Sequence, residues 1–447
     1  MGNGTAYATL GVGESWEGDP LRLRHHGHRR TIRGHGYFKR LGPGIVTGAA
    51  DDDPSGIGTY SQVGAAYGYG ILWATLFVAP MAVAVQEMAA RLGLVTGRGL
   101  ATLIRDRFPR WVLFVCVGIV ALANTFNIAA DLASMGASAH LVVPLPPELL
   151  TIVMAAVMLV LELYLSYRRY ANVLRFLALS LLAYVLVLFA VNVDWAAVVR
   201  GFLVPNLDGG KAELAALIAV FGTTVSPYLF FWQASEEVEE EDEGDATENG
   251  TDVLGPVTGE HLTAMRVDVS GGMVSAVGIA SAIVIATAAT LHAHGITDIG
   301  TADQAARALR PLAGNFAGLL FATGVVGLGL LAVPVLAGST AYAAAEATHR
   351  NEGLSRHFRE ARGFYSVIIG SMLLGLALDF GGLDPIRGLY YAAILNGVTA
   401  PPLILVMLLL ARSRRTLGDH RSGWLSTTVV VATIVVSTAL PVAYLVW

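Results

Sequence analysis

The sequence predicts an all-α polytopic membrane protein, on the evidence of its composition, its apolar segments and the placement of its basic residues. Of its 447 residues, 54% are hydrophobic and only 14% are charged, whereas soluble proteins carry about 25% charged residues. The apolar residues form blocks of roughly 20, the length that crosses the hydrocarbon core of a bilayer. A single cysteine, Cys116, excludes an intramolecular disulfide.

A basic amino-terminal tail, residues 1–40, precedes the apolar segments and is expected to be cytoplasmic and disordered. The tail lacks the apolar core of a secretory signal peptide. Residues 41–447 then form one membrane domain with eleven expected spans. These are 41–66, 69–91, 111–140, 147–166, 172–192, 213–235, 267–293, 313–346, 364–380, 388–411 and 424–446.

The distribution of lysine and arginine predicts the orientation of these spans. With the amino terminus inside, 24 of the 29 basic residues fall in internal segments and 5 in external ones. Cytoplasmic segments of membrane proteins show this bias. We therefore expect a plasma-membrane protein with a cytoplasmic amino terminus and an extracytoplasmic carboxyl terminus.

The expected internal loop at residues 236–262 departs from this pattern. It carries 11 acidic residues between Glu236 and Glu260, with no basic residue among them. A solvated, disordered loop is the simpler interpretation. The alternative is an acidic antechamber that concentrates cations at an inner mouth.

The first span contains the stretch GAADDDPSGIGTYSQ at residues 48–62, where a lipid-buried helix should be apolar. Pro54 removes a backbone donor, and Gly56 and Gly58 lower helix propensity, so we expect the helix to break near Asp53. Irregular backbone at membrane depth is tolerated where it lines a cavity. Freed carbonyls beside a carboxylate would form a cation site. The alternative is a proline kink whose acid bonds to a neighbouring helix.

The sixth span reads LIAVFGTTVSPYLFFWQASEE and predicts a second break. Pro227 lies in its middle, after the small polar residues Thr223, Thr224 and Ser226. If spans 1–5 and 6–10 are two repeats, the breaks occupy corresponding positions. Interrupted helices at such positions indicate a transporter site at an inverted-repeat interface.

Other polar residues lie within the predicted spans. Asn124, Asn127 and Asp131 share one face of a helix through their spacing, and a functional lining and a structural hydrogen-bond seam both remain open. Asn396, in the tenth span, would face the ion pathway that such a functional lining would form.

The sequence contains no Cys/His metal cluster, phosphate loop or nucleophile motif. We therefore expect no enzyme, cofactor, nucleic-acid partner or obligate protein partner. Glu87 and Glu162 lie near predicted cytoplasmic ends, where their side chains would extend to the interface.

Three segments resemble the Nramp family of divalent-metal transporters: LGPGIVTGAADDDPSGIGTYSQVGAAYGYGILW, RLGLVTGRGL and NIAADLASMG. The likeness runs from about Tyr37 to the end of the chain. It implies a LeuT-like inverted repeat of spans 1–5 and 6–10, with helices 1 and 6 broken, an eleventh helix following, and a metal carried between the broken helices. The family's Asp-Pro-Gly-Asn motif corresponds to Asp53-Pro54-Ser55-Gly56, and its Met-Pro-His motif to Ser226-Pro227-Tyr228.

The resemblance implies a set of metal ligands and a set of pathway residues. The ligands would be Asp53, Gly56, Thr223 and Ser226, and the pathway would include Asp52, Tyr228, Gln233, Asp131, Asn127 and Asn396.

The departures from the family motifs carry a prediction about the ion. Loss of the thioether and of the amide removes a soft ligand and bulk, which favours a largely hydrated Mg²⁺, with Mn²⁺ also carried. The sequence in this respect resembles the Nramp-related magnesium transporter branch. Ser134 replaces a family glutamate, and Tyr228 and Gln233 replace histidines, so transport without proton coupling is expected. The alternative is a proton-coupled Mn²⁺/Fe²⁺ importer of the ordinary Nramp type.

Overall fold

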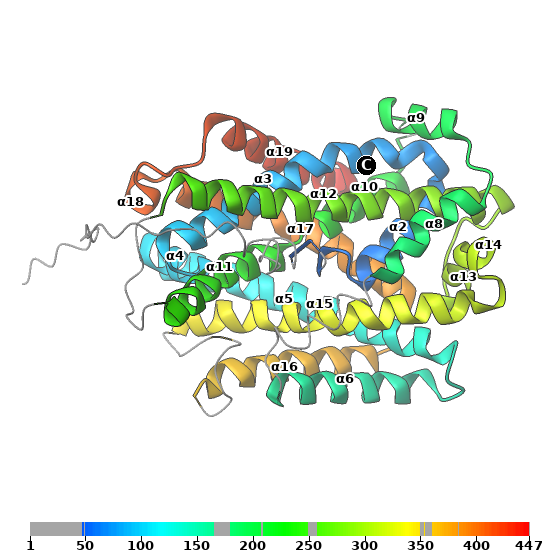
Figure 1. Ribbon diagram of the computed structural model, residues 1–447, viewed down its shortest axis with the longest axis horizontal. Helices are drawn as coiled ribbons and strands as arrows, with labels where there is room; N and C mark the ends of the chain where they lie inside the picture. The colour runs from blue at the N-terminus through cyan, green and yellow to red at the C-terminus, as the bar shows by residue number, and fades with distance from the viewer. Residues whose placement is uncertain are drawn as a thin grey trace, which may run out of the picture.

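The computed structural model describes residues 47, 48, 50–164, 179–206, 209–248, 257–348, 353, 360–382 and 384–446. All regular structure in these ranges is helical. Helices α5 (Arg110–His140), α12 (Gly259–Thr290) and α15 (Ala317–Thr348) run along the length of the molecule, and α6 (Pro147–Tyr164) and α16 (Arg362–Asp379) lie side by side along one edge (Figure 1).

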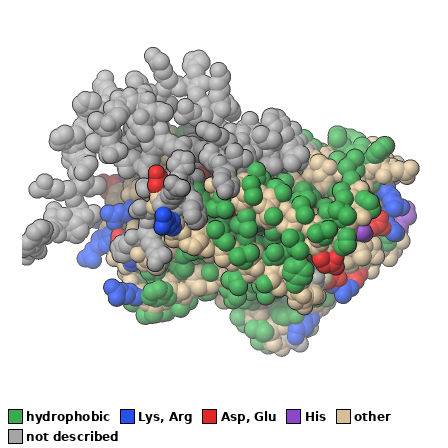
Figure 2. Space-filling view, turned by 90° about the horizontal axis from the view of Figure 1, so that it is seen from below, with side chains coloured by type: hydrophobic (Ala, Val, Ile, Leu, Met, Phe, Trp, Pro, Cys, Tyr) green, Lys and Arg blue, Asp and Glu red, His purple; other side chains and the backbone are tan. Residues whose placement is uncertain are grey.

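The remaining predicted spans also coincide with helices, and the predicted all-α membrane class is confirmed. They are α2 (Pro54–Tyr67), α3 (Leu72–Thr96), α8 (Leu182–Ala190), α10 (Lys211–Thr224) with α11 (Pro227–Glu248), α17 (Pro385–Arg412) and α19 (Trp424–Val446). Eight helical stretches of the described chain are long and apolar enough to cross a membrane, with α2 and α3 counted as one. Figure 2 shows hydrophobic side chains over the middle of one face and charged side chains toward both ends. The tail and residues 172–178 of the fifth span lie outside the described residues.

The short helices between the spans gather at the two ends of the molecule (Figure 1). Helices α4 (Leu100–Arg107) and α18 (Arg414–Leu417), both predicted to be internal, lie at one end. Helices α9 (Trp195–Leu203), α13 (Ala302–Ala306) and α14 (Arg310–Ala313), predicted to be external, lie at the other. These five helices therefore lie at the ends that the basic residues predict, and the orientation in the cell stays a prediction.

Glycines bring α2 and α10, the helices next to the two expected breaks, into backbone contact with neighbouring helices. A Cβ atom added at Gly222 of α10 would lie 2.0 Å from the carbonyl oxygen of Ala393 in α17. One added at Gly64 of α2 would lie 2.5 Å from the carbonyl oxygen of Val284 in α12. Such contacts leave no room for a side chain, so they fix both helices against the surrounding long helices.

Two predictions about acidic residues were wrong. Helix α11 continues to Glu248, so the stretch predicted as a loop at 236–262 begins as helix, and Glu236 and Glu237 are buried. Glutamate is a good helix former, and here it extends an existing helix. Glu87 and Glu162 do not extend to the interface either, because both are buried. Glu87 forms ion pairs with Arg91 and, at 3.1 Å, with Arg266.

Candidate cation site at two helix breaks

The first break places Asp53 between two helical segments. Ala50 and Asp51 are helical, Asp52 and Asp53 are not, and α2 begins at Pro54. The Oδ1 atom of Asp53 accepts hydrogen bonds from the Ser55 hydroxyl at 2.5 Å and the Gly56 amide at 2.8 Å. Asp53 is thus the N-cap of α2. Its Oδ2 atom, 3.4 Å from the hydroxyl of Tyr228, faces away from the cap.

The second break lies between α10 and α11, at Val225 and Ser226. The Ser226 hydroxyl is within hydrogen-bond distance of two α10 carbonyls, Gly222 at 2.9 Å and Thr223 at 3.0 Å. It therefore closes the end of α10 with its proton, and its oxygen lone pairs remain for another partner. The buried Thr223 hydroxyl has no hydrogen-bond partner among the described residues.

Two tyrosines connect the breaks. The Tyr228 hydroxyl donates to the carbonyl of Ala50 at 2.9 Å, which joins the start of α11 to the end of the first helical segment. The Tyr60 hydroxyl of α2 shares a hydrogen bond with Thr224 of α10 at 2.7 Å. Both side chains are fully buried. These two hydrogen bonds therefore hold the two breaks next to each other.

The first break also concentrates negative charge inside the protein. Asp51, Asp52 and Asp53 are each less than 5% exposed. The ion pairs within the described part of the chain lie elsewhere, and Asp51 Oδ1 has no hydrogen-bond partner there. Carboxylates in a membrane interior need a compensating charge or a proton. A bound divalent cation would supply that charge.

The polar face of α5 divides into two parts. Asn127 and Asn396 of α17 exchange hydrogen bonds at 2.9 and 3.2 Å, and Asn124 donates to the Leu336 carbonyl and to Thr340 of α15. These amides form a structural seam. Asp131 is fully buried, and neither of its carboxylate oxygens has a hydrogen-bond partner in the described ranges. The amides thus have partners on other helices, whereas a role for Asp131 in an ion pathway stays a prediction.

Gln233 lies further along α11, away from the breaks. Its side-chain oxygen accepts from Thr47, and its nitrogen donates to Glu237 at 2.9 Å. Thr47 precedes the first break, so this contact is a second link between the two broken helices.

The sequence predicted freed carbonyls beside Asp53 without identifying that of Ala50, and it missed Tyr60. Tyr60 follows the N-cap Asp53 by seven residues, about two turns into α2, and this spacing could have identified it. Nothing in the sequence marks a carbonyl whose partner is distant in the chain. No group of three or more His, Cys, Asp or Glu side chains in the described residues could hold a metal. A cation site here would therefore combine few side chains with backbone oxygens.

Comparison with known proteins identifies the family. Residues 44–447 match Nramp, natural resistance-associated macrophage protein-like. The chain belongs to the Nramp family. A relative from Klebsiella pneumoniae named divalent metal cation transporter MntH is 28% identical over 411 residues, which cover 88% of this chain and 92% of that protein. Another of the same name, from Pectobacterium carotovorum, is 32% identical over 302 residues, covering 65% and 68%.

Solved structures confirm the LeuT-like architecture. A variant of the manganese transporter of Eremococcus coleocola superposes with a TM-score of 0.71 at 18% identity, covering 92% of this chain and 87% of that one. Mhp1, a nucleobase-cation-symport-1 family transporter, gives 0.58 at 12% identity, covering 91% and 92%. Membership of the family also confirms that the chain is a multi-pass membrane transporter rather than an enzyme. The names of these relatives do not mention magnesium, so the predicted magnesium branch gains no support from them.

Proposed function

We propose that this Nramp protein transports divalent cations, Mn²⁺ among them, through a site formed by the two helix breaks. The observation that carries the proposal is the geometry of Asp53, whose Oδ1 caps α2 while Oδ2 has a long contact, at 3.4 Å, with the hydroxyl of Tyr228. The Ala50 carbonyl and the free lone pairs of Ser226 would complete an oxygen-rich site. The relatives named for divalent metals and manganese support the same choice.

Mg²⁺ is the second candidate, on a specific observation. The donors at the breaks are carboxylate, hydroxyl and carbonyl oxygens, with Gly56 and Ser226 where the family has an amide and a thioether. A Cβ atom at Gly56 would have its nearest neighbour, the Asp51 carbonyl oxygen, at 3.4 Å, so the site is less crowded with glycine here than with the family's asparagine. Hard oxygen ligands and retained waters suit Mg²⁺.

Transport without proton coupling is part of the proposal. Ser134, where the family has a glutamate, donates to the backbone carbonyl of Asp131 at 2.8 Å. Tyr228 and Gln233 stand where the family has histidines, and neither titrates near neutral pH. Asp131 alone would remain to carry a proton. A proton-coupled mechanism of the ordinary Nramp type would therefore require Asp131 to carry the proton.

Uptake into proteoliposomes that contain a pH-sensitive dye tests each part. We expect Mn²⁺ uptake by the wild type, loss of uptake in Asp53→Asn with the protein still folded, and no luminal acidification at clamped membrane potential. Millimolar Mg²⁺ should compete with Mn²⁺. Uptake by Asp53→Asn at the wild-type rate would place the site elsewhere. Acidification in proportion to Mn²⁺ that disappears in Asp131→Asn would establish the proton-coupled mechanism instead.

A further inference from the structure

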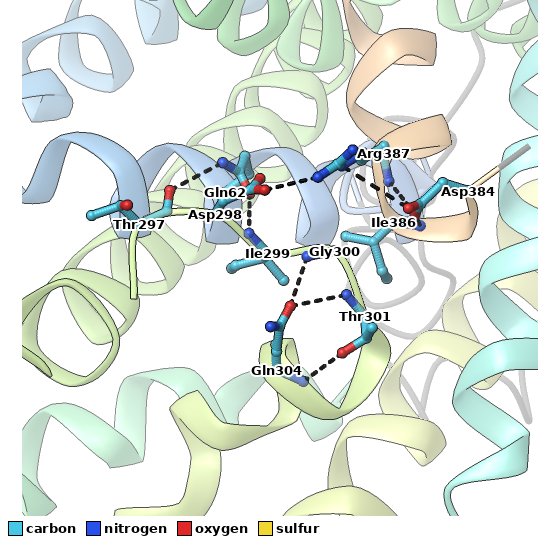
Figure 3. A network of polar contacts seen from close by, with 10 residues as sticks. All are labelled: Gln62, Thr297, Asp298, Ile299, Gly300, Thr301, Gln304, Asp384, Ile386 and Arg387. Atoms are coloured by element: carbon cyan, nitrogen blue, oxygen red, sulfur yellow. Dashed lines mark hydrogen bonds and ion pairs between the residues drawn. The ribbon is translucent and has the colours of Figure 1, made fainter. Parts of the chain in front are cut away.

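The segment between α12 and α13 connects α2 to α17 at the end of the molecule that carries α13 and α14 (Figure 3). Gln62 of α2 donates to the Thr297 carbonyl at 3.4 Å and accepts from the Ile299 amide at 2.8 Å. Between these two positions, Asp298 forms an ion pair at 2.8 Å with Arg387 of α17. One short segment thus contacts two helices, and one of them, α2, has Asp53 as its N-cap.

The segment is braced by hydrogen bonds of its own. The Gln304 side chain accepts from the amides of Gly300 at 2.8 Å and Thr301 at 3.2 Å, and the Thr301 hydroxyl accepts from the Gln304 amide at 3.3 Å (Figure 3). This capping box fixes the start of α13. Asp384 is the N-cap of α17, and Arg387 lies in the first turn of this helix. Both partners of the ion pair therefore extend from ordered backbone.

A cavity of about 390 Å³ lies beside this connection. Gln62, Asp298 and Arg387 line it, together with Tyr67 and Tyr390. Gln62 follows Asp53 by nine residues, which is about 13 Å along the axis of α2. The wall of the cavity therefore includes α2 about two and a half turns beyond the first break.

We propose that Asp298 and Arg387 form an outer latch that holds α17 and the segment against α2, and that the pair must separate before a cation reaches Asp53 through the cavity. The side chains are 64% and 53% exposed. An exposed pair of this kind is weak and reversible, which suits a contact that opens in each transport cycle. The two Gln62 hydrogen bonds keep the segment on α2, so opening separates α17 from the segment. Both residues are positioning residues for the transport proposed above, on which this inference rests.

Thiol labelling of the purified protein tests the latch. Cys116 is the only cysteine and is buried, so Ala66→Cys, which lines the cavity, reports access to it. In this background, Asp298→Asn and Arg387→Gln should each raise the maleimide labelling rate about 1.5- to 5-fold, the range for an exposed ion pair. The double variant Asp298→Arg with Arg387→Asp should return the rate toward that of the parent.

A neighbouring ion pair provides the matched control. Asp303 of α13 and Arg307, the residue after α13, pair at 2.8 Å with similar exposure, but this pair links the segment to neither α2 nor α17. Asp303→Asn should leave the labelling rate unchanged, and only the latch variants should lower the KM for Mn²⁺ uptake. Equal rates in Asp298→Asn, Arg387→Gln and Asp303→Asn would overturn the latch. A wild type that carries no divalent cation would overturn the proposed function, while the labelling rates would still decide the latch.

Discussion

Replacing Tyr228 by phenylalanine should strengthen the binding of Mn²⁺. In the structure the hydroxyl donates to the Ala50 carbonyl at 2.9 Å and lies 3.4 Å from Asp53 Oδ2. A cation that binds these oxygens would replace the hydrogen bond that the Tyr228 hydroxyl donates to them. A hydrogen bond of this kind contributes about 0.5–1.5 kcal/mol net, so removing it should lower the Kd for Mn²⁺ by about 2- to 10-fold.

Isothermal titration of purified protein with Mn²⁺ measures this change. Tyr60→Phe is the control, because the Tyr60 hydroxyl bonds to Thr224 at 2.7 Å and to neither Ala50 nor Asp53 in the described contacts. Both variants should lose a similar amount of thermal stability, whereas only Tyr228→Phe should bind more tightly. Weaker binding by Tyr228→Phe with unchanged binding by Tyr60→Phe would refute the reasoning, because the hydroxyl would then support the ion rather than compete with it.

Two further predictions concern glycines at the breaks. Gly56→Ala should fold and express as the wild type, because its Cβ atom has a nearest neighbour at 3.4 Å. Gly222→Ala should lower the melting temperature sharply, since its Cβ atom would meet a backbone oxygen at 2.0 Å; equal melting temperatures would contradict this. Gly56→Asn with Ser226→Met restores the family's ligands and should shift selectivity toward Cd²⁺ over Mg²⁺. Competition for Mn²⁺ uptake measures the shift, and an unchanged Cd²⁺ to Mg²⁺ ratio in a folded double variant would contradict the assigned ligands.

The two breaks were predictable because proline and polar residues coincide there. Proline alone is insufficient: Pro80 and Pro334 lie within the unbroken helices α3 and α15. Pro54 and Pro227 instead occupy the first position of a new helix, where the missing amide costs nothing. At these positions the preceding Asp53 and Ser226 satisfy backbone groups that the break exposes.

The contacts between the breaks were not predictable from one sequence. Tyr228 and Ala50 are 178 residues apart, and Tyr60 and Thr224 are 164 apart. Only packing of the surrounding helices brings them together, and local propensity contains no information on it. The same holds for the outer latch, since Asp298 and Arg387 read as ordinary exposed charges in the sequence.

The seam formed by Asn127 and Asn396 shows a related limit. The helical spacing of Asn124, Asn127 and Asp131 correctly indicates a shared face, but it does not separate amides that pair from a carboxylate that does not. That distinction depends on the polar groups that other helices present. Here α15 and α17 supply partners for the amides, and the described residues supply none for Asp131.

Anomalous diffraction from crystals grown with Mn²⁺ tests the central claim most directly, because it locates the ion without reference to transport. We expect an anomalous peak between the two breaks, in direct or one-water contact with Asp53 Oδ2 and near the Ala50 carbonyl and Ser226 hydroxyl. The peak should be absent from Asp53→Asn crystals grown in the same way. A wild-type peak at another group of carboxylates, with none at Asp53, would contradict the account.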